Sequence, residues 1–529
     1  MTFVLTRSVN KAYNYYIDII VDINISNVNM IIRRTKMKAK RTISMLLLTA
    51  MLAGLAACGD NSSGQSEDTK ASGADDSETT AALTGRDAVS DDLPDKNYNG
   101  KTFTIMDRTA YKYEFEVPEE TGDLVDDAIY KRNTAVEDRF KIELNYYTLD
   151  ATWGEQATNF NNTLRSSVMA GDGAFDLVAG YAATIPGLVS DGIFMNWNEM
   201  KYNDFTKPWW SEAVANELTI NGKAYMVTGD ISLALWKGMT CFFFNKKLAD
   251  DYKISDIYQT VKDGKWTLDT LIEYTKDVYN DLDGDGTRSD SDMYGFLCMR
   301  DTEVDNMKEA FEVKVTEKDS NGYPKIVFKN ERTVEVVTKL NAFIHGNDGV
   351  LFPATGGNTG RTQLATAFSE DRGIFFTSTL GVSETLRSMN SDFGIIPYPK
   401  YDETQKSYHS SSLDEFSLFL IPMDAKDPEM TSIITEALCA ESYKIVVPKF
   451  YDVALKTRNA RDDDSSEMID LIRDGLTFDW GYLHSSSLGG VGHLFVNLIR
   501  NNDNNVVSGF DANASTYEEK LKTVLEVYR

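Results

Sequence analysis

The stretch KTFTIM at residues 101–106 opens the part of the chain that decides the fold. Polar and apolar residues alternate in it, as they do in KIELNYY at 141–147, and this period of two predicts strands. Residues 123–140 instead carry apolar side chains at helical spacing, and 159–170 form a second such segment before a short apolar strand, FDLVA at 175–179. This alternation of strands and helices predicts a parallel sheet with crossover helices, which is typical of the α/β class.

The length of the chain predicts a second lobe in addition to this sheet. Residues 94–529 exceed the roughly 250–300 residues at which a single hydrophobic core stops growing. Hydrophobic residues make up 42% of the chain and charged residues 26%, which is typical of a globular protein. The formal net charge of −27 argues against nucleic acid as a partner, because phosphates require a basic surface.

Several segments together resemble one protein family. MAGDGAFDLV at 169–178, followed by LVSDGIF at 188–194, resembles the first lobe of the extracellular solute-binding proteins of ABC importers, in particular the carbohydrate-type group that includes family 1. The likeness continues in order through KPWW at 207–210, LTINGKAYMVTGDIS at 218–232, CFFFNKKL at 241–248, GKWTL at 264–268, AFSEDRGI at 367–374, FGIIPYP at 393–399, VPKFYDVAL at 447–455 and ARDDDSSEM at 460–468.

The resemblance implies a two-lobed fold like the type II periplasmic-binding proteins, in which each lobe is a mixed sheet flanked by helices. It also implies a hinge of about three crossings, near 234–242, 360–367 and 401–412. The chain is then divided into a first lobe at 94–235, a second lobe at 236–365, a return to the first lobe at 366–402, and the second lobe with the C-terminal helices at 403–529.

By the same resemblance, the protein is not an enzyme. It is expected to be a monomer that captures a sugar or oligosaccharide between its lobes and delivers it to the permease subunits of an ABC transporter. Two alternatives stay open: a secreted, calcium-stabilised glycoside hydrolase, which needs two carboxylates facing each other across a cleft, and a peptide receptor of the same fold. A metal receptor is disfavoured, because none of the four histidines has metal-ligand spacing to another: His345, His409, His484 and His493.

The expected ligand site combines flat aromatic side chains with polar partners near the segments that face the cleft in the family. Sugars present apolar CH faces ringed by hydroxyls, so a site that binds them needs both aromatic and polar side chains. The polar side chains also provide selectivity, because a ligand that leaves one of them without a partner binds less tightly. The candidate aromatic residues are Trp236, Tyr181, Trp480 and Tyr482, and the candidate polar residues are Asp107, Arg108, Asp230 and Glu415. We interpret the other tryptophans at 197, 209, 210 and 266 as packing residues, and the cysteines at 241, 298 and 439 as buried thiols.

The N-terminal region predicts where the protein is held. The segment at 37–58, MKAKRTISMLLLTAMLAGLAAC, has a positively charged region, then an apolar region, then small residues, which is the order found in signal peptides. We assign the signal peptide to residues 37–57. LAAC at 55–58 resembles the bacterial lipobox, so Cys58 is expected to carry a lipid that anchors the mature chain on the extracellular face of the cell membrane. An ordinary secretory signal and a single membrane helix are the alternatives.

The segments on either side fit this interpretation. Residues 1–36 match no targeting pattern, and we expect translation to begin at Met37, with an unusual N-terminal extension as the alternative. Residues 58–93 are polar and acidic with few large apolar side chains, so they cannot bury enough surface to order themselves. We expect them to form a disordered tether between the lipid and the folded body.

One motif predicts a metal site from its own spacing, DLDGDGTRSDSD at 281–292. Carboxylates at positions 1, 3 and 5 of a loop, with glycine at position 6, are the pattern that wraps oxygen ligands around Ca²⁺. The predicted structural Ca²⁺ ligands are Asp281, Asp283, Asp285, Thr287 through its carbonyl, Ser289 and Asp292. Aspartate replaces glutamate at position 12, so the affinity is expected to be low. The alternative is an acidic, solvated turn.

Overall fold

A computed structural model describes residues 85–451 and 462–529, all of which belong to one compact unit, Ala82–Arg529. The predictions for residues 1–57, for Cys58 and for the tether up to residue 84 lie outside the described residues. Among the described helices, none is both long enough and apolar enough to cross a bilayer.

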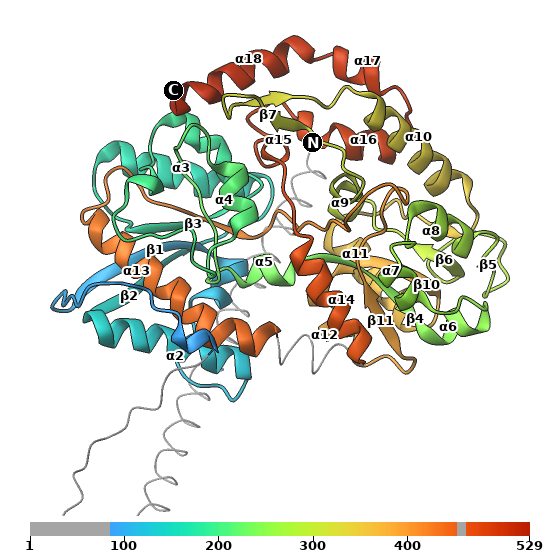
Figure 1. The fold of residues 1–529 in the computed structure, drawn as a ribbon, viewed down its shortest axis with the longest axis horizontal. Coiled ribbons are helices and arrows are strands. Elements are labelled where there is room, and N and C mark those ends of the chain that lie inside the picture. Colours follow the sequence, from blue (N-terminus) through green and yellow to red (C-terminus); the bar gives the residue numbers. More distant parts are fainter. Residues whose placement is uncertain (1–84, 452–461) are drawn as a thin grey trace, which may run out of the picture. The chain divides into compact units, whose positions relative to one another are not determined.

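The first sheet has the strand order β12-β3-β1-β2. β1 runs parallel to both β2 and β3, and β12 pairs antiparallel to β3. The strands are β1 (Lys101–Arg108), β2 (Ile142–Leu149), β3 (Leu177–Tyr181) and β12 (Ser417–Leu420), and the crossover helices are α2 (Leu124–Phe140) and α3 (Glu155–Ala170). The predicted order of strands and helices is therefore confirmed (Figure 1).

The second sheet has the order β11-β4-β10-β6-β5, with β9 paired to β6. β10 is parallel to β6 and antiparallel to β4, so the sheet is mixed as predicted. Its strands are β4 (Thr240–Asn245), β5 (Tyr279–Asn280), β6 (Met293–Leu297), β9 (Val350–Leu351), β10 (Gly373–Thr379) and β11 (Phe393–Ile396), and β7 (Thr316–Lys318) and β8 (Pro324–Ile326) form a separate hairpin.

Helices cover both sheets (Figure 1). The α-helices besides α2 and α3 are α4 (Glu212–Leu218), α5 (Leu233–Lys237), α6 (Lys246–Asp251), α7 (Ile257–Lys262), α8 (Leu268–Thr275), α9 (Thr302–Ala310), α10 (Glu331–Gly346), α11 (Gly357–Ser369), α12 (Ser383–Leu386), α13 (Pro428–Glu441), α14 (Asp463–Asp474), α15 (Trp480–Leu483), α16 (Leu494–Arg500), α17 (Val506–Asp511) and α18 (Ala514–Leu525). Short helical turns are η1 (Gly85–Ala88), η2 (Thr109–Glu114), η3 (Ile185–Asp191), η4 (Trp197–Glu199), η5 (Leu380–Val382), η6 (Ser442–Val446), η8 (Val491–His493) and η9 (Glu526–Tyr528).

Local sequence sets the ends of the first crossover helix. The Asp123 carboxylate accepts hydrogen bonds from the backbone N–H groups of Val125, at 2.9 Å, and Asp126, at 3.3 Å, so it caps α2. Lys141 then takes a left-handed conformation, with φ at 50°, which turns the chain directly into β2. These two residues fix where the helix begins and ends.

The cores of the lobes contain the residues that we interpreted as packing residues. Trp197, Trp209 and Trp266 are fully buried, and Trp210 is 5% exposed. The three cysteines of the described body are buried and form no disulfide, as predicted. Both sets therefore contribute to stability through apolar burial.

The predicted division of the later chain between the lobes is wrong. Residues 366–402, expected to return to the first lobe, supply β10 and β11 to the second sheet, whereas β12 and α13, expected in the second lobe, belong to the first sheet and its covering helices. The crossing expected near 360–367 falls within α11, which packs on β10. An apolar strand pattern does not specify its pairing partner, because that choice depends on distant segments.

The crossings that the structure contains follow from the sheet order. The chain leaves the first lobe between α5 and β4, and it returns between β11 and β12, close to the crossings predicted near 234–242 and 401–412. It leaves the first lobe again between α13 and α14, since α14 packs on β11. Part of that last connection, residues 452–461, lies outside the described residues.

The last residues assigned to the tether belong to the folded body. Asp91 pairs with Arg139 at 2.5 Å, and Asp92 pairs with Lys207 at 2.6 Å. The side chains of Val89 and Leu93 pack against the core of the first lobe. The expectation of disorder is therefore wrong for residues 85–93, because two apolar side chains and two carboxylates hold them there.

The C-terminal helices contact both lobes, although residues 403–529 were assigned to the second lobe. α16 packs on α9 and α10, α17 packs on α10, and α18 packs on η3 of the first lobe. At the end of the chain, the Asn221 amide donates to the carbonyl of Tyr528 at 2.9 Å, and Lys223 Nζ donates to the carbonyl of Arg529 at 2.7 Å. Figure 1 shows α16, α17 and α18 as an arc above the two sheets.

Candidate functional site

The topology brings several candidate residues to one edge of the first sheet. Because β1, β2 and β3 are parallel, their carboxyl ends lie at the same edge, where ligands bind in open α/β sheets. Arg108 ends β1, Tyr181 ends β3, and Trp153 follows β2. In the second sheet, the corresponding parallel strands are β6 and β10, and α9 follows β6.

A set of side chains from both lobes meets at this edge. We call it the interlobe cluster, and it consists of Arg108, Tyr111, Tyr181, Asp305, Arg361, Asp414, Glu415, Tyr482 and His493. Four predicted ligand residues, Arg108, Tyr181, Glu415 and Tyr482, are therefore brought together. The other five members of the cluster lie in segments in which the sequence analysis found no motif.

Arg108 lies close to two aromatic rings. Its guanidinium carbon is 3.9 Å from the ring centre of Tyr111 and 5.2 Å from that of Tyr181. Nη2 donates to the carbonyl of Glu415 at 2.7 Å and to Ser417 Oγ at 3.1 Å. The residue is 1% exposed, so β1, η2 and the segment before β12 hold it rigidly.

Glu415 links the lobes through a chain of charged contacts. Its Oε2 accepts the Tyr111 hydroxyl at 2.7 Å, and its Oε1 lies 3.7 Å from Arg361 Nη1 on α11. Arg361 Nε also pairs with the fully buried carboxylate of Glu303 on α9 at 2.6 Å. This chain joins the connection before β12 to two helices of the second lobe.

The other side of the cluster is acidic and contains a histidine. The Tyr482 hydroxyl donates to Asp414 Oδ2 at 3.2 Å, and the Tyr482 ring lies 5.6 Å from that of His493. Burial raises the pKa of Asp414 to about 6. Burial alone would lower the pKa of His493, but the carboxylates of Asp305 and Asp414 outweigh it and raise that pKa above its usual value.

Trp153 lies at the rim of the cluster. The side chain is 63% exposed, and its ring centre is 6.4 Å from that of His493. Sequence reasoning missed it, together with Tyr111, Asp305, Arg361, Asp414 and His493. Its position in the loop that follows a predicted strand was the available signal, because the ends of parallel strands converge.

Several buried polar atoms of the interlobe cluster, and of residues close to it along the chain, lack partners. Within the described residues, Arg108 Nε and Nη1, Thr184 Oγ1, Asp305 Oδ1 and Asn306 Nδ2 make no hydrogen bond. Thr184 follows β3 at the same edge as Arg108, and Asn306 adjoins Asp305 on α9. A buried polar group that lacks a partner costs about 1–3 kcal/mol. A ligand hydroxyl that reached these atoms would supply the missing partner.

The structure places the other four predicted ligand residues elsewhere. Asp107 precedes Arg108 in β1 and so faces the other side of the sheet, where burial raises its pKa to about 6. Trp480 is fully buried and stacks on His484 with ring centres 4.0 Å apart. Asp230 and Trp236 line a separate cavity.

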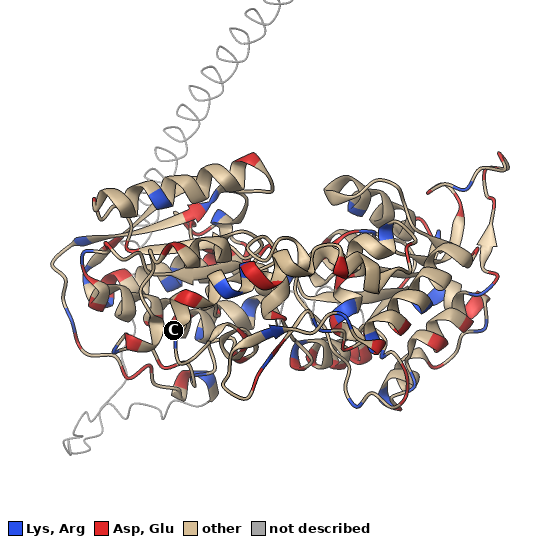
Figure 2. Cartoon of the chain, turned by 90° about the horizontal axis from the view of Figure 1, so that it is seen from above, with Lys and Arg blue, Asp and Glu red and all other residues tan. Residues whose placement is uncertain are grey.

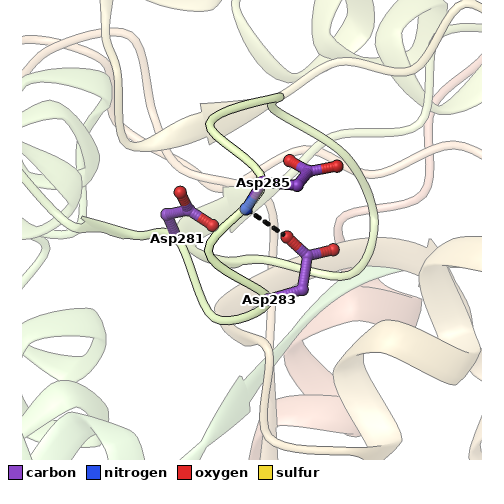
Figure 3. Close-up of side chains that lie close together, drawn as sticks. All are labelled: Asp281, Asp283 and Asp285. Carbon is purple, nitrogen blue, oxygen red and sulfur yellow. Dashed lines mark hydrogen bonds between the residues drawn. The ribbon is translucent and has the colours of Figure 1, made fainter.

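The acidic loop at 281–292 gathers three of its predicted ligands. Carboxylate oxygens of Asp281, Asp283 and Asp285 lie within 4.8 Å of one another (Figure 3). Both oxygens of Asp281 accept backbone N–H groups of the loop, from Gly284 at 2.7 Å and Gly286 at 3.0 Å. These bonds hold the turn in a shape that points the carboxylates inward.

Asp292 is used differently from the other loop carboxylates. It is fully buried, and it accepts the backbone N–H groups of Leu282 at 3.1 Å and Ser289 at 3.0 Å. The Tyr279 hydroxyl donates to it at 3.3 Å. Asp292 thus closes the loop through hydrogen bonds to its backbone.

No protein-family model and no curated protein matches the chain. Solved structures do. A cyclo/maltodextrin-binding protein complexed with maltotetraose is 14% identical, with a TM-score of 0.50 over 81% of this chain and 96% of that one. The chain has the fold of maltodextrin-binding proteins. The two-lobed fold predicted from the sequence is thereby confirmed.

Two further structures agree with this fold. The maltose/maltodextrin-binding domain MalE from Bdellovibrio bacteriovorus, bound to maltotriose, is 13% identical with a TM-score of 0.51 over 80% of this chain and 100% of that one. The GacH receptor of Streptomyces glaucescens GLA.O, solved unliganded and with acarbose, is 12% identical with a TM-score of 0.50 over 80% and 98%.

Proposed function

We propose that the protein is a binding protein that captures a sugar or oligosaccharide in the interlobe cluster and delivers it to an ABC transporter. The observation that carries this proposal is the buried side chain of Arg108, whose Nε and Nη1 lack hydrogen-bond partners and whose guanidinium lies beside the rings of Tyr111 and Tyr181. Flat rings fit the CH faces of a sugar, and the polar atoms fit its hydroxyls.

The similar structures support an oligosaccharide, since they contain bound maltotetraose, maltotriose and acarbose. The exposed ring of Trp153 extends the interlobe cluster toward solvent, which favours a ligand longer than one sugar unit. Acidic and basic positions are mixed over both lobes in Figure 2, and the formal net charge of −27 argues against nucleic acid as a ligand.

Lobe closure is the proposed mechanism of capture. The ligand would contact residues of both lobes, and it would shift the open–closed equilibrium by its higher affinity for the closed state. The Glu415–Arg361 contact spans the two lobes and would be made or broken in this motion. We further propose that the protein acts as a monomer, held on the extracellular face of the cell membrane by a lipid on Cys58.

A thermal-shift screen of the purified protein against mono- and oligosaccharides tests the proposal. A ligand present at a hundred times its dissociation constant adds about 2.7 kcal/mol to the free energy of unfolding. Tyr181→Ala should abolish the shift, whereas Tyr147→Ala, an exposed tyrosine on β2 outside the interlobe cluster, should keep it. Cleaved sugar would favour the hydrolase, and a response to peptides alone would favour a peptide receptor.

We propose separately that the acidic loop binds Ca²⁺ in a structural role. The convergence of Asp281, Asp283 and Asp285 supports this, with the Thr287 carbonyl, Ser289 and Asp292 as the remaining ligands. Calorimetric titration with CaCl₂ should give a dissociation constant of about 10⁻⁴–10⁻³ M, as in extracellular modules. Unchanged binding by Asp281→Ala and Asp283→Ala would refute the assignment.

A further inference from the structure

A cavity of about 370 Å³ lies against the first crossing of the chain, and we call it the hinge cavity. Its described walls come from three stretches, 208–216, 229–239 and 473–476, and they include no residue of the interlobe cluster. Its volume is within the range of small-molecule pockets in proteins. It also contains the two predicted ligand residues, Asp230 and Trp236, that the interlobe cluster leaves out.

Asp230 places a carboxyl group in the wall of the hinge cavity. The residue is 5% exposed, and burial raises its pKa well above the usual range, with the charge of Arg86 and the indole N–H of Trp236 opposing this shift only partly. Among the described residues, no cation forms an ion pair with this carboxylate. The wall thus contains a buried acid that lacks a counter-charge.

The rest of the wall is aromatic and acidic. Trp210 and Trp236 line the cavity, and Glu212 and Asp474 add two more carboxylates. Arg473 also reaches the wall, but its Nη2 pairs with Asp474 at 2.8 Å and its guanidinium lies 5.3 Å above the ring of Tyr451. Its charge is therefore already matched, and the cavity remains acidic.

The walls come from both lobes. Trp236 belongs to α5, directly before the chain crosses to β4, and Trp210 precedes α4 in the first lobe. Asp474 ends α14, which packs on β11 of the second sheet. Movement of one lobe against the other would change the shape of this cavity.

We propose that the hinge cavity binds a small organic ammonium ion, held by the carboxylate of Asp230 and the ring of Trp236. The ammonium group would supply the charge that the buried acid lacks, and aromatic rings attract such cations. Alkyl groups on the ion would pack against Leu235 and Met239. This assignment does not depend on the proposed sugar binding. Because the walls come from both lobes, an occupant would also bias lobe closure.

Choline and its neutral carbon analogue, 3,3-dimethylbutan-1-ol, have nearly the same shape and differ in charge, so they test the proposal directly. Each is titrated into the purified full chain by calorimetry, with tryptophan fluorescence as a second readout. Choline should bind one site per chain, at least about tenfold more tightly than the alcohol, a ratio that corresponds to about 1.4 kcal/mol. No choline binding, or equal binding of the two molecules, would overturn the proposal.

Variants then locate the site. Asp230→Asn keeps the size of the side chain and should weaken choline binding at least about tenfold, whereas Asp474→Asn, which removes a carboxylate already paired with Arg473, should weaken it less. Trp236→Leu should also weaken binding and serves if Asp230→Asn does not fold. Choline binding that Glu415→Gln abolishes and Asp230→Asn retains would place the ion in the interlobe cluster and contradict the assignment.

Discussion

The interlobe cluster and the acidic loop at 281–292 both gather carboxylates, but they do so in opposite ways. The loop brings Asp281, Asp283 and Asp285 together from alternate positions of one short segment, and these side chains are largely exposed to solvent. The interlobe cluster takes Asp414 and Asp305 from segments far apart in the chain and sets them among buried partners. Water therefore screens the charges in the loop, whereas each buried charge in the cluster is stabilised by its charged partners.

The largest effect is expected when Arg361 of the interlobe cluster is removed from its ion pair with Glu303. Arg361→Ala leaves the fully buried carboxylate of Glu303 without its cation, so the free energy of unfolding should fall by about 3–5 kcal/mol. Urea denaturation measures this loss. Arg165→Ala is the matched control, because Arg165 pairs with Asp191 at the surface and should cost at most about 1 kcal/mol. Equal losses in the two variants would contradict the contrast between buried and exposed charges.

The next effect is a dependence of stability on pH that originates in the interlobe cluster. The pKa of Asp414 is raised to about 6, so its protonated form is favoured in the folded state. This contribution is present below pH about 4 and is lost as the pH rises through about 6. The raised pKa of His493 acts in the same direction, since its charged form is favoured and is lost as the pH rises.

We therefore expect the free energy of unfolding to fall by about 1.4 kcal/mol through Asp414 between pH 5 and pH 8. Asp414→Asn should reduce this fall, and urea denaturation at several pH values measures it. Asp283→Asn in the acidic loop is the control and should leave the profile as in the wild type. A wild-type profile in Asp414→Asn would show that this carboxyl is not the source.

A smaller effect is expected at the rim of the interlobe cluster. Trp153→Ala should weaken the binding of a longer oligosaccharide by about 1 kcal/mol, the size of one aromatic contact, with little change in folding stability because the side chain is 63% exposed. Calorimetry with sugars of increasing length measures this. If the shortest and the longest sugar lost equal affinity, Trp153 would not extend the site.

The smallest effect on stability is expected in the acidic loop without calcium. Asp283→Ala removes an exposed carboxylate and should change the free energy of unfolding by less than about 0.5 kcal/mol. Added Ca²⁺ should raise the melting temperature of the wild type and not that of the variant. A large loss of stability in the calcium-free variant would mean that this carboxylate supports the fold by itself.

The sequence predicted the parts of the fold and site that are formed by neighbouring residues. The order from β1 to β3 follows from apolar periodicity, and the loop at 281–292 follows from carboxylate spacing. Arg108 and Tyr181, predicted from the family resemblance, end β1 and β3, whose parallel pairing sets both residues at one edge of the sheet. Trp153 follows β2 at this edge and was not predicted.

Other predictions failed because they concerned distant partners. The flat aromatic ring of Trp480 is suited to contact a sugar, but it stacks on His484 and is completely buried. Asp107 differs from Arg108 by one position, and the pleat of the strand sends the two side chains to opposite faces. The sequence around Trp480 or Asp107 would look the same whether the side chain faced a ligand or the core.

The sequence by itself determined the class of fold, the helices and strands of the first sheet, and the position of the acidic loop, because each depends on interactions among residues close along the chain. The tertiary structure alone decided that β10 and β11 join the second sheet, that β12 returns to the first, and that Arg361 and His493 meet Glu415 and Asp414. Strand pairing and buried charge pairing join segments that are far apart in the chain, and no local pattern specifies which distant segment completes them.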